Sequence, residues 1–224
     1  GESEPFCTIE IWTNDDCSGA PSYSAETGDD NAFDVLVDAE PNDTLTFSAR
    51  STDPAGNVSG CGEPIIYLHD DIPPAVPVID ATSPVSPSSF LEPVVHGTSD
   101  GEVQIEIYDN ANCTGIPLGA AEASAGGLFA VTVTPAVNTT TTLHAQAIDD
   151  AGNVSGCSES LDYIHDDTQP TIPVILESIP ESPNNQSTEP LLRGSAEPNA
   201  TIRIYTNDTC TGAASAVSSS DVIG

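Results

Sequence analysis

One stretch that the chain repeats three times indicates the fold. It reads IEIWTNDDC at Ile9–Cys17, IEIYDNANC at Ile105–Cys113 and IRIYTNDTC at Ile202–Cys210. From Cys17 to Cys113 the chain advances by 96 residues, and from Cys113 to Cys210 by 97. A period of this length is one small domain, so the sequence predicts a tandem array of similar domains.

Apolar and polar residues alternate in short runs around the second copy. The apolar positions of three such runs are Val103, Ile105 and Ile107; Phe129, Val131 and Val133; and Leu143, Ala145 and Ala147. Alternation is typical of strands with one buried face. No run has helical periodicity, and Pro, Gly, Asn and Asp interrupt every run. We therefore predict an all-β fold in which each period forms an antiparallel β-sandwich.

Two matching segments, Tyr67–Pro77 and Tyr163–Pro173, are expected to link successive domains. Each has two acidic residues followed by spaced prolines, a composition that favours a short, extended linker. The predicted boundaries give a first repeat at 1–74, a middle repeat at 75–170 and a third repeat at 171–224. Only the middle repeat is expected to be complete, and the chain is interpreted as a window of a longer polypeptide or a processed piece.

Charge restricts the partners. The chain has 35 Asp and Glu but only three basic residues, giving a formal net charge of −32. Nucleic acid and anionic membrane surfaces are disfavoured as partners, and cations are favoured. No apolar run reaches the roughly 18 residues of a membrane-spanning helix, so no membrane insertion is expected. A hydrophobic content of 38%, arranged in alternating runs, argues against disorder.

Two further recurring segments suggest a family. Asp53–Ser59 reads DPAGNVS and Asp149–Ser155 reads DDAGNVS, while Gly194–Ile202 reads GSAEPNATI. With these segments the whole chain resembles the bacterial immunoglobulin-like repeats of large surface adhesins and fibrous exoproteins. The resemblance implies tandem immunoglobulin-like antiparallel β-sandwich domains at a cell surface. It also implies a stalk whose successive domains bind Ca²⁺ where they meet.

In an immunoglobulin-like topology, two loops and the entering linker lie at the same end of a domain, and here all three are acidic. In the middle repeat this set comprises Asp70, Asp71, Asp100, Glu102, Asp149 and Asp150. The corresponding acids elsewhere are Glu4, Asp53, Asp166, Asp167 and Glu197. Two carboxylates about 4 Å apart repel by roughly 1–4 kcal/mol, whereas Ca²⁺ is coordinated by six to eight oxygens. These residues are thus candidate calcium ligands; alternatively, they lie on exposed turns, where Asp149 organises its own turn.

Four of the six cysteines fall into a repeated frame. Cys17 and Cys61 are 44 residues apart, as are Cys113 and Cys157. Paired cysteines at fixed spacing favour disulfides and an oxidising, extracellular location. Two pairings stay open: one within each domain, and a Cys17–Cys157 bridge between successive domains, since Cys113 and Cys157 are expected near opposite ends of the sandwich. Cys7 is expected to be a small buried residue.

The sequence shows no catalytic pattern. There is no glycine-rich phosphate loop, and His144, expected to point outward, has no Ser or Cys placed to use it as a base. His69 and His165, expected to face solvent, lack the further ligands that zinc requires.

The favoured function is an extracellular stalk or fibre, with calcium ions and neighbouring repeats or copies as partners. One alternative is an adhesin that contacts host or neighbouring cells. Its only candidate contact stripe is Trp12, Tyr108 and Tyr205, which cross-strand packing would also explain. Another alternative is a filament in which successive chains complete each other's domains by strand addition.

Overall fold

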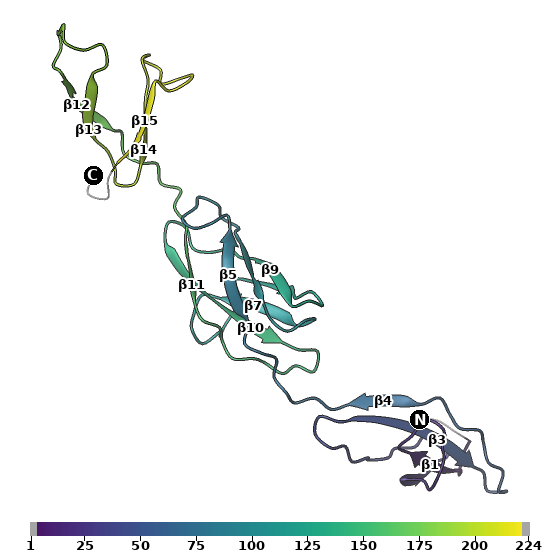
Figure 1. Ribbon diagram of the computed structural model, residues 1–224. Coiled ribbons are helices and arrows are strands. Elements are labelled where there is room, and N and C mark those ends of the chain that lie inside the picture. The colour runs from purple at the N-terminus through teal and green to yellow at the C-terminus, as the bar shows by residue number, and fades with distance from the viewer. Residues whose placement is uncertain (1–3, 221–224) are drawn as a thin grey trace. The chain divides into compact units, whose positions relative to one another are not determined.

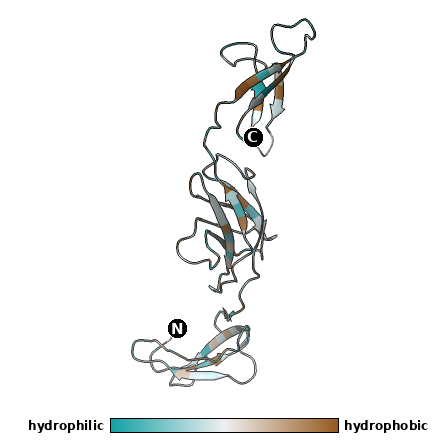
Figure 2. Cartoon of the chain, turned by 90° about the vertical axis from the view of Figure 1, so that its left-hand side faces the viewer, coloured by the Kyte–Doolittle hydropathy of each residue, from teal (hydrophilic) through white to brown (hydrophobic). Residues whose placement is uncertain are grey.

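The computed structural model describes residues 4–220, which contain strands and no helix (Figure 1). The chain divides into two compact units, residues 1–165 and 166–224. The boundaries near residues 74 and 170 stay predictions. Within the described residues, no helix is long and apolar enough to cross a membrane. Hydrophobic segments, brown in Figure 2, lie on the strands of every repeat.

The middle repeat is a two-layer antiparallel sandwich of seven strands. One sheet has the order β11-β10-β7-β8, and the other has the order β5-β6-β9. Their bounds are β5 Val78–Ser83, β6 Val94–Thr98, β7 Gln104–Tyr108, β8 Gly119–Glu122, β9 Leu128–Thr132, β10 Thr140–Ile148 and β11 Leu161–Ile164. The predicted all-β immunoglobulin-like sandwich is confirmed.

The core of the middle repeat consists of the alternating apolar residues that the sequence predicted. Ile105, Ile107, Val131, Leu143 and Ala145 are all fully buried. They alternate with polar residues because successive side chains of a strand point to opposite faces of the sheet, so one face is buried between the two layers.

The first repeat forms a single four-stranded sheet of order β2-β1-β3-β4. Its strands are β1 Thr8–Trp12, β2 Tyr23–Glu26, β3 Thr44–Thr52 and β4 Ile65–Leu68. A small core forms around Cys7, Ile9, Ile11 and Phe47. The predicted burial of Cys7 is confirmed, since 2% of the residue is exposed.

The described part of the third repeat contains two separate hairpins. One pairs β12 (Val174–Ile179) with β13 (Leu191–Ser195), and the other pairs β14 (Thr201–Ile204) with β15 (Ala216–Ser219). A bulge between Ile175 and Glu177 interrupts the first hairpin. The same bulge occurs between Ile79 and Ala81 where β5 pairs with β6.

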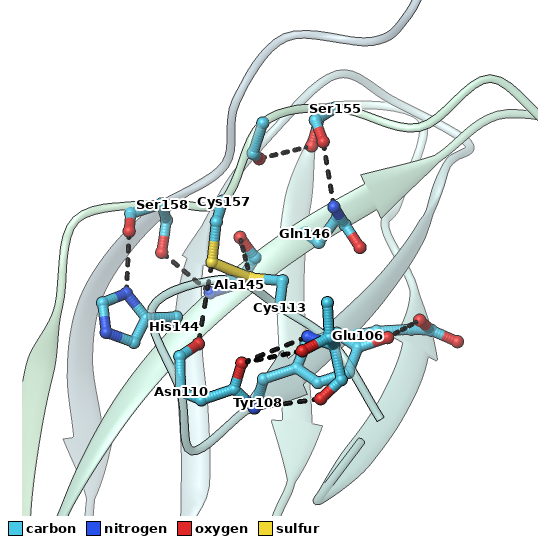
Figure 3. Close-up of a disulfide and its surroundings, with 12 residues drawn as sticks. Glu106, Tyr108, Asn110, Cys113, His144, Ala145, Gln146, Ser155, Cys157 and Ser158 are labelled. Atoms are coloured by element: carbon cyan, nitrogen blue, oxygen red, sulfur yellow. Dashed lines mark hydrogen bonds between the residues drawn. A yellow bond between two sulfur atoms is a disulfide. The ribbon is translucent and has the colours of Figure 1, made fainter. Parts of the chain in front are cut away.

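Two disulfides lie within domains: one joins Cys17 to Cys61, and the other, shown in Figure 3, joins Cys113 to Cys157. The Cα atoms of Cys113 and Cys157 are 5.7 Å apart. The expectation that they lie near opposite ends is wrong. After its turn the chain runs back along β10, where the Ser158 amide donates to the Ala145 carbonyl, and this places Cys157 beside Cys113. The alternative Cys17–Cys157 bridge is excluded because both residues are already paired.

The expected aromatic contact stripe is buried at two of its three positions. Trp12 and Tyr108 are each 5% exposed. The Arg50 guanidinium lies 5.6 Å from the centroid of the Trp12 ring, and the Tyr108 hydroxyl donates to the Glu106 carboxylate over 2.5 Å. Burial, together with this carboxylate, raises the pKa of Tyr108 to about 12. Packing within the sheet thus explains these aromatic residues.

Candidate functional site

The strongest candidate site is the first linker, residues 70–77, because both neighbouring repeats hydrogen-bond to it. On the side of the middle repeat, the Ala75 amide donates to Oδ2 of Asp100 over 2.7 Å. The side-chain amide of Asn153 donates to the Asp70 carbonyl over 3.1 Å. Pro77, at the end of the linker, is fully buried. The linker thus contacts two loops of the middle repeat, and on this side the bonded linker atoms belong to its main chain.

Asn42 of the first repeat holds the other side of the linker. Its side-chain amide donates to Oδ1 of Asp71 over 2.7 Å, and its Oδ1 accepts the Asp71 amide over 2.8 Å. Its own main-chain amide donates to Nδ1 of His69 over 3.2 Å. Asn42 has a φ of 59°, a left-handed conformation that asparagine tolerates better than most residues. The two hydrogen bonds between Asn42 and Asp71 fix the start of the linker to the last strands of the first repeat.

Parts of the same arrangement recur one period later. The Asn138 amide donates to Nδ1 of His165 over 2.9 Å, and Asn138 has a φ of 54°. The Thr171 amide donates to a carboxylate oxygen of Glu197 over 3.1 Å, as the Ala75 amide does to Asp100. The contacts at His69 and Ala75 thus recur with the repeat.

Two histidines differ from their predicted orientation. His165 is 1% exposed instead of facing solvent, because its Nδ1 accepts the Asn138 amide at the end of β11. His144 is 9% exposed instead of pointing outward, and its Nδ1 lies 2.9 Å from the Ser158 carbonyl oxygen. The returning segment that places Cys157 beside Cys113 also covers the His144 ring.

The Asp-x-Ala-Gly-Asn segments form turns in which the aspartate accepts the hydrogen bonds. Oδ1 of Asp149 accepts the Asn153 amide over 2.8 Å, and its Oδ2 accepts the Asn153 side chain over 3.0 Å. Asp53 accepts the same two bonds from Asn57, over 2.8 and 2.7 Å. Burial acts to raise the pKa of Asp149, but hydrogen bonds, chiefly from Asn153, lower it overall. The Asn57 hydrogen bonds likewise lower the pKa of Asp53.

Other candidate ligands also accept local hydrogen bonds. Oδ1 of Asp70 accepts the Ile72 amide, and Oδ1 of Asp166 accepts the Thr168 amide, each over 3.0 Å. Glu4 contributes its main-chain carbonyl, which accepts the Thr27 hydroxyl over 2.6 Å. Carboxylates that cap turns in this way are the alternative that the sequence left open.

The acids do not assemble into a calcium site in this arrangement. Between residues 4 and 220, no three His, Cys, Asp or Glu side chains are gathered so that they could hold a metal ion. Four acids line one depression of about 400 Å³ in the middle repeat without forming a ligand group: Glu102, Glu122, Asp149 and Asp150. Since Ca²⁺ requires six to eight converging oxygens, the side chains as placed do not fit it, and calcium binding stays a prediction. The remaining candidate, Asp167, makes an interaction of its own.

Sequence reasoning missed the residues that bond the linker: Asn42, Asn138 and Asn153. Asn42 and Asn138 occupy equivalent positions one period apart, as do His69 and His165. This shared recurrence was a signal that could have identified them. The acids were predicted as site residues instead, because the strongly negative net charge favours cations as partners.

No family model matches the sequence, and no curated protein does. Solved structures that match include one described as "Biofilm associated protein - BSP domain", with a TM-score of 0.32 and 18% identity. The match covers 74% of this chain but only 26% of that chain. Another is the "D00-D0 domain of Intimin", with a TM-score of 0.25, 14% identity, and coverage of 70% of this chain and 78% of that one.

Proposed function

We propose that this chain is a structural segment of an extracellular stalk or fibre, in which hydrogen-bonded linkers limit bending between successive sandwich domains. The observation that carries the proposal is the first linker, bonded at Asp71 by the repeat before it and at Ala75 by the repeat after it. The two disulfides support an extracellular location, since such bonds persist in oxidising compartments.

The linker bonds restrict a segment that would otherwise act as a hinge. Each hydrogen bond contributes a net free energy of about 0.5–1.5 kcal/mol, and several act on a stretch of eight residues, 70–77. Prolines at 73, 74 and 77 further restrict the backbone. A linker that is both bonded and conformationally restricted transmits orientation from one domain to the next. This property is what a projecting stalk requires.

A non-enzymatic role is part of the proposal. His144, which is buried in the middle repeat, has its Nδ1 against the Ser158 carbonyl. It is therefore a poor candidate for a catalytic base. An adhesive role for the aromatic stripe has no support either, because Trp12 and Tyr108 are buried.

Calcium is not required by this proposal, because hydrogen bonds already hold the linker. Asp71 accepts its bond from Asn42 through Oδ1, and Asp100 accepts its bond from Ala75 through Oδ2, with no metal ion involved in either contact. The calcium prediction and the hydrogen-bond proposal therefore lead to different results when calcium is removed.

Small-angle X-ray scattering of the whole chain tests both. We expect the same distance distribution in calcium and in chelator, and a broader distribution for the double variant Asn42→Gly with Asp100→Ala. Asn31→Gly is the matched control, since Asn31 also has a positive φ, of 66°, but its amide bonds within its own turn. A wild-type chain as flexible as the double variant would refute the proposal. A distribution that sharpens on adding calcium would favour the calcium prediction.

A further inference from the structure

The Cys113–Cys157 disulfide closes a loop that contains three of the seven strands of the middle repeat. β8, β9 and β10 lie between the two cysteines, whereas β5, β6 and β7 precede Cys113 and β11 follows Cys157. The chain enters this repeat through β5 and leaves it through β11, so both ends of the repeat lie outside the loop. A pull on these two ends therefore reaches the bridge from both sides.

The first repeat has its bridge at the same place in the order of strands. β1 precedes Cys17, β2 and β3 lie between Cys17 and Cys61, and β4 follows Cys61. The two paired cysteines are 44 residues apart in sequence in both repeats. The strand that enters the bridged segment and the strand that leaves it are thus outside the closed loop in each case.

A disulfide gives tension a path that is shorter than the chain between its cysteines. The Cα atoms of Cys113 and Cys157 are 5.7 Å apart, whereas the residues that join them could span about 150 Å when fully extended. Once the strands outside the loop are pulled straight, the tension passes through the two sulfur atoms and the loop stays slack. β8, β9 and β10 then carry no tension, although β10 pairs with both β7 and β11 in the folded repeat.

Hydrogen bonds join the entering and the leaving part of the middle repeat directly. The Ser88 amide donates to the Ile164 carbonyl over 3.0 Å, and the Ser86 hydroxyl accepts the Ile164 amide over 2.7 Å. The Tyr163 hydroxyl donates to the Phe90 carbonyl over 2.7 Å. These bonds tie the segment after β5 to β11, so a pull on the two ends has to break them before the strands outside the loop can separate.

We propose that the disulfide of the repeat is an extension stop. Under tension, the middle repeat lengthens only by the residues outside the Cys113–Cys157 loop, which are about half of the stretch from Val78 to Ile164. When the tension falls, fewer residues have to come back together, and the entropic cost of closing a loop increases with its length. This inference rests on the proposed stalk function, because a projecting stalk is the structure on which tension would act.

Force measurements on single molecules of the whole chain, held at its two ends, test the extension stop. Cys210 is exposed and free, so Cys210→Ser is the background throughout and prevents disulfide-linked dimers. Without reductant, the residues between paired cysteines should never be released. A small thiol added under sustained tension should release about 150 Å of contour length at each bridge. In this exchange the thiolate attacks one sulfur and forms a mixed disulfide, while the other sulfur leaves as a thiolate.

The number of releases identifies the bridges. The background chain should show two releases of about 150 Å, because both loops have the same sequence separation. Cys113→Ser combined with Cys157→Ser should leave one release, from the first repeat. Cys17→Ser combined with Cys61→Ser should leave the release from the middle repeat. The count does not require a variant repeat to fold, since a bridge that is absent releases nothing in either state.

Two serine variants test which bonds resist the pull first. Ser86→Ala removes the acceptor of the Ile164 amide, outside the loop, and should shorten the lifetime of the folded middle repeat under tension by up to about 10-fold. Ser124→Ala removes a bond of the same kind, from the Leu128 amide over 3.1 Å, inside the loop. It should change that lifetime by less than about 2-fold. Equal lifetimes for the two variants would refute this assignment of the resisting bonds.

The outcomes separate the extension stop from the stalk function. If the middle repeat extends through its full length without reductant, or if the thiol releases no added length, the extension stop is overturned. Neither result bears on the stalk function, which scattering tests in the absence of tension. A linker that proves flexible in scattering would overturn the stalk function, while the lengths released by the thiol would stay the same.

Discussion

The bond between Asn42 and Asp71 allows a local test of the linker. In the Asn42→Gly variant, the backbone keeps its left-handed conformation, since glycine adopts positive φ freely. The bond from the Asn42 main-chain amide to His69 can also remain. The substitution removes only the two side-chain bonds to Asp71, at 2.7 and 2.8 Å.

The magnitude follows from those two bonds. Both are at an exposed position, so we place them at the lower end of the usual range, about 0.5–1 kcal/mol each. Opening the start of the linker then costs about 1–2 kcal/mol less in the variant, which corresponds to a roughly 5- to 30-fold larger open population. The Asp71 amide, which donates to Asn42 Oδ1, should exchange with solvent faster by that factor.

Amide exchange followed by NMR measures this rate residue by residue. The Ala75 amide is an internal control, because it donates to Asp100 and should be unaffected by the substitution. Asn31→Gly should leave both amides unchanged. If the Asp71 amide of the wild type already exchanges at the rate of an unstructured peptide, or if Asn42→Gly does not accelerate it, the bonded linker is refuted.

Three further results are expected. Replacing Cys113 and Cys157 by alanine opens a loop with a sequence separation of 44; the chain-entropy relation predicts a loss of about 4 kcal/mol, and calorimetry should show the middle repeat melting roughly 15 °C lower or more. Burial tends to raise the pKa of Asp149, but hydrogen bonds lower it from 3.8. The Asp149 carboxylate therefore stabilises the fold at pH values above its unfolded-state pKa, and this contribution is lost as the pH falls through the lower folded-state pKa. An NMR titration midpoint of Asp149 at or above 3.8 would contradict this. Gly97→Ala places a Cβ 2.1 Å from a carbonyl oxygen of the facing strand and should cost roughly 1–3 kcal/mol in urea unfolding. Gly126→Ala, whose Cβ would meet nothing nearer than 4.0 Å, should change stability by under about 0.5 kcal/mol.

Strand alternation predicted the core of the middle repeat because a sandwich buries one side of each strand. Ile105, Val131 and Leu143 were identified from spacing alone, and all three are fully buried. The same reasoning was wrong for His144 and His165. Alternation describes only how a residue faces its own sheet, and both histidines are covered by segments that pair or bond at the edges of the sheet.

The predicted calcium ligands stay a prediction, whereas the structure shows which atoms of the linker form hydrogen bonds. Linker and loops were expected to approach each other, and Ala75 does bond to Asp100. The sequence could not show which atoms would meet, because an aspartate can accept a backbone amide as readily as it can bind a cation. Asn42 was missed because its role depends on Asp71, which lies 29 residues later.

By itself, the sequence determined the repeat, the all-β class and the strands that carry the core, since these follow from periodicity along the chain. Tertiary structure decided which cysteines pair. The segment after the turn folds back along β10 and places Cys157 next to Cys113, a proximity that spacing cannot encode. It also decided that the acidic side chains bond to nearby backbone amides. A hydrogen bond depends on distances of about 3 Å between atoms, and only the folded chain sets those distances.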